Sequence, residues 1–247
     1  MGFRMKLPFP PNPDYGDGLV RRIVSLNNID GCLVEAHLVD NYHEMRCRVR
    51  HNGSIVTGVD GEMIRFPTTA CPGAPLVAAE LAGLRLDAPT RELYNRTLVR
   101  RNCTHLFDIV VLAMKHALRK ETARCYITEV PDEDCEPVEI NIRSNNHMIH
   151  KWLVQRGNII KPEILYGLPI LEGFAKWSAQ YFVGEELEAG LILSKACFIA
   201  LIRRYQPEAG HGWPISANTQ LIGACHAYSP GQVKTARLIG NPSAVPG

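Results

Sequence analysis

The sequence predicts an α+β fold, in which an antiparallel β-meander packs against helices and a second segment of strands and helices follows. Two observations support this prediction. Hydrophobic residues recur with a period of two before they take on the helical period, and this order of strands then helices occurs twice along the chain. A doubly wound parallel sheet would alternate single strands with single helices, so the observed order favours α+β.

Composition and periodicity divide the chain into four segments. We expect a Pro-rich N-terminal arm at 1–29, a meander with its helices at 30–120, more strands and two helices at 121–206, and a loop-rich tail at 207–247. A chain of 247 residues with 46% hydrophobic residues can bury a large core, and we expect all four segments to form one compact unit. The tail can close over a site as a lid or pack as ordinary surface.

Three strands are predicted in the meander, at 32–40, 43–50 and 54–66. Their alternation places one set of residues toward the core, namely Cys32, Val34, Ala36, Leu38, Met45, Cys47 and Val49. The pair Asn52-Gly53 predicts a type I′ hairpin turn between the second and third strands, because both central positions of that turn need a positive φ.

Helices are predicted after the meander at 75–84, 91–101 and 103–120. Pro75 suits the first turn of the first helix, and Asn102 is expected to cap the third. The second half repeats the pattern with strands and then helices, which we place at 124–130, 137–143, 147–155, 170–182 and 186–204.

Charge and cysteine usage narrow the class of protein. The chain has 27 Lys+Arg and 25 Asp+Glu, a net charge of +2, which lacks the basic excess of a nucleic-acid binder. Prolines interrupt any signal peptide, and the most apolar stretch, 187–202, is too short and too charged to span a bilayer. We therefore expect a cytoplasmic protein with reduced thiols that binds a small molecule, not nucleic acid or a membrane. Formation of a homo-oligomer is left open.

The segment Cys103-Thr104-His105 is the first candidate site. At a helix N-terminus the dipole and free amides favour a thiolate on Cys103, and His105 and Asp108 share a helix face three residues apart. Such a group can orient an imidazole, hold a metal or transfer protons. The alternative is a cysteine in a capping turn beside a partly exposed histidine.

The first two strands carry a second cluster of titratable residues. Glu35 and His37 lie on one strand face, with Asp40, His43 and Glu44 just beyond, and together they can form a proton-transfer site. The next strand presents a row of arginines that can bind a carboxylate, made of Arg46, Arg48 and Arg50. The alternative is a solvated face whose charges have no catalytic role.

Other candidates are spread along the chain. Cys71 also precedes a helix and can converge with Cys103 on one site, and Trp152 lies near two histidines in the second half. The chain has no dinucleotide-binding or P-loop glycine motif, no G-x-S-x-G and no H-E-x-x-H. Nucleotide-dependent chemistry, serine hydrolysis of that type and zincin proteolysis therefore lose support.

Three segments resemble an uncharacterised bacterial family known as a domain of unknown function. They are 38–50, then 66–84 with 102–110, and 186–204 with Trp177 upstream, and the likeness is most specific at the Cys-Thr-His-Leu of 103–106. The first half is also similar to the iron–sulfur scaffold fold of the NifU and SufE type, with Cys71, Cys103 and His105 near the ligand positions. Those scaffolds have a further Cys or Asp ligand near the first cysteine, where this chain has Cys71-Pro-Gly-Ala.

The family resemblance implies an accessory enzyme of bacterial aromatic or steroid catabolism. We expect a carbon–carbon lyase without an organic cofactor, acting by proton transfer on a lignin-derived aromatic substrate and releasing formaldehyde. Its expected catalytic residues are His43, His105, Glu35, Asp40, Cys103 and Asp108, and its expected substrate-binding residues are Arg48, His37 and Trp152. The alternative is a carrier of zinc or an iron–sulfur cluster, with Cys71, Cys103, His105 and one acidic residue as ligands.

Overall fold

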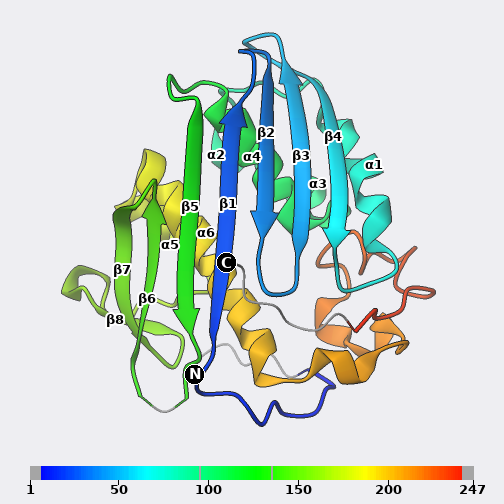
Figure 1. The fold of residues 1–247 in the computed structure, drawn as a ribbon, viewed down its shortest axis with the longest axis vertical. Helices are drawn as coiled ribbons and strands as arrows, with labels where there is room; N and C mark the ends of the chain where they lie inside the picture. Colours follow the sequence, from blue (N-terminus) through cyan, green and yellow to red (C-terminus); the bar gives the residue numbers. More distant parts are fainter. Residues whose placement is uncertain (1–6, 95, 135, 241–247) are drawn as a thin grey trace. The chain divides into compact units, whose positions relative to one another are not determined.

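The computed structural model describes residues 7–94, 96–134 and 136–240 (Figure 1). These residues contain eight strands, six α-helices and several short 3-10 helices, so the α+β class is confirmed. They fall into two compact units. We call residues 24–124 with 208–240 the meander unit, and residues 7–23 with 125–207 the arm unit, and describe each by itself.

Strand β1 (Leu19–Asn28) begins in the arm unit and ends in the meander unit. Its residues alternate between buried and half-buried along most of its length, as a strand with one face toward a core does. The Pro-rich N-terminal arm was expected to extend to residue 29. That boundary was wrong, because the prolines end at Pro13 and the alternation starts six residues later.

The meander unit has strand order β4-β3-β2-β1, with β2 (Leu33–Val39), β3 (Glu44–His51) and β4 (Val56–Arg65). β3 pairs antiparallel with both of its neighbours. The residues expected in the core are buried except Cys32, which is exposed ahead of β2. The loop after β3 is longer than a type I′ turn: Gly53 has φ +87°, but Asn52 is not in that region and instead accepts from the N–H groups of Ser54 and Ile55.

Helices of the meander unit cover one face of its strands (Figure 1). They are α1 (Ala74–Ala78), α2 (Thr90–Leu93), α3 (Arg96–Arg101) and α4 (Thr104–His116). α4 packs on β2 and β3, and its Leu106, Ile109 and Met114 are fully buried. Its N-cap is Cys103, one residue beyond the expected Asn102.

Gly61 of β4 lets two helices approach the sheet closely. A Cβ atom at this position would lie 3.0 Å from Leu106 Cδ2 and 3.2 Å from Pro75 Cβ. A side chain here would therefore require Leu106 and Pro75 to shift by a few tenths of an ångström. The absence of a side chain at Gly61 therefore allows the first turn of α4, which contains Leu106, to pack directly against β4.

The tail packs onto the meander unit. Ile215, Ala227, Tyr228, Val233 and Ala236 form a buried cluster with Ala70 and Cys71. Backbone hydrogen bonds join Thr69 N to Arg237 O at 2.9 Å and Ile239 N to Pro67 O at 2.9 Å. Between 208 and 240 the tail therefore contributes to a core instead of lying loosely on the surface.

The arm unit has strand order β1-β5-β6-β7-β8. Its other strands are β5 (Ala123–Pro131), β6 (Val138–Ser144), β7 (His147–Gln155) and β8 (Asn158–Lys161). Helix α6 (Gly184–Ala200) packs on β6 and β7, with α5 (Phe174–Tyr181) beside it. The short β8 was not expected, because the sequence pattern there is only four residues long. No helix among the described residues has the length and apolar character needed to cross a membrane.

Candidate active site

The connection between β2 and β3 carries a buried carboxylate–imidazole pair. Asp40 Oδ1 accepts hydrogen bonds from the backbone N–H of Tyr42 at 2.9 Å and of His43 at 2.8 Å. The same oxygen lies 3.0 Å from His43 Nδ1. Asp40 is fully buried and His43 is 6% exposed. Two backbone donors on one oxygen favour the ionised carboxylate, so we assign the proton of this third bond to Nδ1 of His43.

A second imidazole lies against the first. The ring centroids of His43 and His105 are 4.3 Å apart, with the ring planes inclined by 48°. His105 is in the first turn of α4, and this helix lies over β2 and β3, so its N-terminal turn meets the end of the β2–β3 connection. The structure thus brings together Asp40, His43 and His105, which come from the two separate candidate clusters of the sequence.

The thiols near this site are neutral. Burial raises the pKa of Cys103 to about 12, and the nearby Cys71 and Cys225 raise it too, while the amides of Leu106 and His105 only partly offset these effects. Burial likewise raises the pKa of Cys71 to about 11, although Thr68 hydrogen-bonds to its sulfur at 3.1 Å. The expectation of a Cys103 thiolate was wrong, because desolvation of the anion outweighs the helix N-terminus.

Glu35, His37 and Arg48 lie elsewhere. They belong to the face of β2 and β3 opposite the buried residues that contact α4. On that partly exposed face Arg48 Nε pairs with Glu35 at 2.7 Å, and His37 Nε2 lies 3.2 Å from Glu44. The acid, imidazole and guanidinium groups of Glu35, His37 and Arg48 therefore share one sheet face, but the buried Asp40 and His43 of the β2–β3 connection are not on it. The solvated-face alternative describes these three residues.

Two further candidates have local packing roles. The Tyr94 hydroxyl donates to Asp108 Oδ1 at 2.8 Å, which ties α4 to the end of α2. Trp152 is 2% exposed in the core of the arm unit, where its ring stacks at 6.1 Å on Phe182 and lies 4.7 Å from the ring of His150.

The alternative metal ligands do not form a site. Among the residues that the structure describes, no group of three or more His, Cys, Asp and Glu side chains is placed to hold a metal ion. Cys71, Cys103 and His105 are all among the described residues. With pKa values of about 11 and 12 the two thiols would also have to lose protons on binding, which costs affinity near neutral pH.

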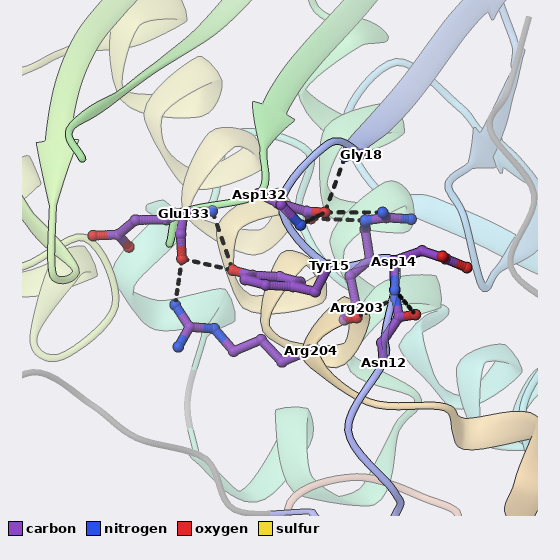
Figure 2. Close-up of polar contacts among 9 residues, drawn as sticks. Asn12, Asp14, Tyr15, Gly18, Asp132, Glu133, Arg203 and Arg204 are labelled. Atoms are coloured by element: carbon purple, nitrogen blue, oxygen red, sulfur yellow. Dashed lines mark hydrogen bonds and ion pairs between the residues drawn. The ribbon is translucent and has the colours of Figure 1, made fainter. Parts of the chain in front are cut away.

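A second buried carboxylate, in the arm unit, was not found from the sequence. Asp132 accepts from Arg203 Nε at 2.8 Å and from its terminal nitrogen at 2.9 Å, and from the N–H groups of Gly16 and Gly18 at 3.1 Å each (Figure 2). Nearby, the Tyr15 hydroxyl donates to the Glu133 carbonyl at 2.9 Å, and the Arg204 guanidinium lies 5.2 Å from the Tyr15 ring. This network fastens the N-terminal arm to the 3-10 helix Leu201–Arg204 that follows α6.

Comparison with known proteins adds a family match over part of the chain. Residues 26–119 match the family described as "Protein of unknown function (DUF2889)". The predicted resemblance to an uncharacterised domain family is thereby confirmed for this region, which contains Asp40, His43, Cys103 and His105. No curated protein and no solved structure matches the chain.

Proposed function

We propose that the protein is an enzyme that acts on a small molecule by acid/base proton transfer. The observation that carries this proposal is the buried Asp40–His43 pair with the His105 ring 4.3 Å from that of His43. A carboxylate that accepts from Nδ1 leaves the lone pair on Nε2, which is the arrangement of an oriented general base. A purely structural histidine has no need of a second imidazole against its ring.

The three residues take distinct roles in this proposal. His43 removes a proton from the substrate through Nε2, and Asp40 stabilises the imidazolium that forms. His105, on the first turn of α4, is the second proton carrier and acts as the acid. Cys103 is a neutral neighbour and takes no proton from the substrate, because its pKa of about 12 keeps it protonated.

For the reaction we propose a carbon–carbon lyase step on an aromatic substrate in which a carbon attached to the ring bears a hydroxymethyl group. The base takes the hydroxyl proton, the oxygen forms a carbonyl as the carbon–carbon bond breaks, and formaldehyde leaves. The electron pair remains on the adjacent carbon, where conjugation with the aromatic ring stabilises it, and the acid then protonates that carbon. Atoms and electrons balance without an oxidant, so the step needs no organic cofactor. The resemblance noted in the sequence motivates this choice of substrate.

Formaldehyde release tests the reaction directly. Purified protein is incubated with lignin-derived phenylpropanoids that carry a hydroxymethyl group, and with the same compounds lacking it. We expect formaldehyde only from the first set, and loss of release in His105→Gln while His147→Gln, at an exposed histidine of the arm unit, behaves as wild type. Release that persists in both His43→Gln and His105→Gln would remove the imidazole pair from the mechanism.

The alternative function, a carrier of zinc or an iron–sulfur cluster, stays a prediction. Among the described residues, no group of three or more potential ligands is placed to support it. Metal analysis of protein purified without oxygen separates it from the enzyme. A stoichiometric metal that Cys71→Ser removes would support the carrier, and the likeness to the NifU and SufE type with it.

A further inference from the structure

Arg65, the last residue of β4, holds the connection that carries Asp40 and His43. Its position opposite Glu44 in the β3–β4 register places it beside the start of β3. One terminal nitrogen donates to the Asp40 carbonyl at 2.6 Å and to the His43 carbonyl at 3.4 Å, and the other donates to the Asn41 carbonyl. A single guanidinium therefore contacts three of the four carbonyl groups between β2 and β3.

These contacts involve the backbone of the connection and not its catalytic side chains. The Asp40 N–H also donates to the His43 carbonyl at 2.8 Å, so the four residues close into a tight loop. The Asp40 carboxylate is left to bind the N–H groups of Tyr42 and His43 and the His43 ring. The planar fork of arginine fixes the directions of its donors, which a lysine ammonium does not.

The Nδ1 bond depends on this backbone geometry. Asp40 and His43 are three residues apart, and the carboxylate reaches both the backbone N–H and the ring nitrogen of His43. A change in the dihedral angles at Asn41 or Tyr42 would move the carboxylate relative to the ring. Hydrogen bonds weaken steeply as their angle departs from linear, so small shifts suffice to release the imidazole.

We propose that Arg65 is a positioning residue of the candidate active site, which keeps the Asp40 carboxylate and His43 Nδ1 aligned by binding the carbonyl groups of the β2–β3 connection. The effect of Arg65 on catalysis rests on the proposed function, in which His43 is the general base. The alignment itself is a property of the folded chain that is measured without a substrate.

The test is the tautomer of His43, read from ring nitrogen and proton shifts of the 15N-labelled full chain. In the wild type we expect His43 to be protonated on Nδ1, with a slowly exchanging N–H proton. His43→Gln assigns the signal. In Arg65→Met we expect mixed tautomers and exchange faster by about tenfold, the size of effect that loss of one hydrogen bond produces. Arg85→Met, at an exposed arginine paired with Asp87, is the control and should leave the His43 signals unchanged.

Arg65→Lys is a second variant that keeps the test decisive if Arg65→Met does not fold. It keeps the charge and most of the side chain, so we expect a folded protein with an intermediate exchange rate. Added guanidinium ion should slow the exchange in Arg65→Ala toward the wild-type value. A His43 ring that keeps its Nδ1 proton and its exchange rate in both Arg65→Lys and Arg65→Met would overturn the proposal.

The same variants separate this proposal from the proposed function. If the His43 tautomer depends on Arg65 but no hydroxymethyl aromatic compound releases formaldehyde, the positioning role stands and the proposed reaction fails. If release depends on His43 but neither the tautomer nor kcat changes in Arg65→Lys and Arg65→Met, the reaction stands and the positioning role fails.

Discussion

Two buried aspartates of this protein have almost the same backbone setting and different partners. Asp40 in the meander unit accepts from two backbone N–H groups of a tight loop and then from an imidazole. Asp132 in the arm unit accepts from the N–H groups of Gly16 and Gly18 and then from two nitrogens of the Arg203 guanidinium. Both side chains are completely buried.

The partner decides what each carboxylate can do. A guanidinium stays charged at any pH the folded protein meets, so the Asp132–Arg203 pair has no proton to exchange and serves to fasten the arm. An imidazole can accept and donate a proton at its two ring nitrogens, and in the meander unit the ring of His105 lies against that of His43. The contrast teaches that burial and backbone donors alone do not indicate a catalytic carboxylate.

The largest effect is expected at the imidazole of the meander unit. His43→Gln should lower turnover by roughly 10²–10⁴-fold, the usual contribution of a positioned general base. The side chain keeps an amide that can donate to Asp40, so the thermal midpoint should change little. Initial rates of formaldehyde release and a melting curve check both parts. Unchanged turnover would show that the Asp40–His43 pair is structural, like Asp132–Arg203.

The next effect concerns stability and the arm unit. Asp132→Asn should lower the free energy of unfolding by about 3 kcal/mol, because it leaves the Arg203 charge buried and without its carboxylate. Denaturant titration of the full chain measures the change. Turnover measured well below the unfolding transition should be retained. A stability loss below about 0.5 kcal/mol would mean that the network does not fasten the arm.

The pH dependence sharpens the same comparison. Burial by itself raises the pKa of Asp132, but hydrogen bonds from Arg203 and the two glycine amides outweigh it, and the net pKa is lower than usual. Its stabilisation is thus fully present above the unfolded pKa of about 3.9 and is lost as the pH falls through the lower folded value. The acid decline of wild-type stability should therefore be shallower in Asp132→Asn. Equal declines in the two proteins would count against the ion pair.

The smallest effect is expected on the outer face of the meander. Glu35→Gln removes an ion pair in which both partners are well exposed, so the free energy of unfolding should change by less than about 0.5 kcal/mol. Turnover should be unchanged as well. A turnover loss comparable with that of His43→Gln would return Glu35 to the catalytic site.

Much of the meander was predictable, because alternation alone identifies β2 and β3 and the residues they bury. His43 and His105 were both nominated from the sequence, but their contact depends on how α4 lies across the strands. The N-cap of that helix was predicted one residue early, and the thiolate on Cys103 was wrong. Burial, which is a property of the packed chain, determines the pKa of that thiol.

Other errors have equally specific reasons. Alternation shows that Glu35 and His37 share a face, yet it does not show which face a helix covers, so both interpretations stayed open. Asp132 and Arg203 are 71 residues apart and sit in no motif, and only the folded chain brings them together. The prolines that precede β1 obscured the alternation that follows them.

The central claim is that the Asp40 carboxylate takes part in proton transfer and the Asp132 carboxylate does not. Formaldehyde release by Asp40→Asn and Asp132→Asn, measured side by side at a temperature where both are folded, tests it most directly. We predict that Asp40→Asn loses most of its turnover because a neutral amide no longer stabilises the imidazolium that forms on His43, while Asp132→Asn keeps the wild-type rate. Equal rates in the two folded variants would contradict the claim.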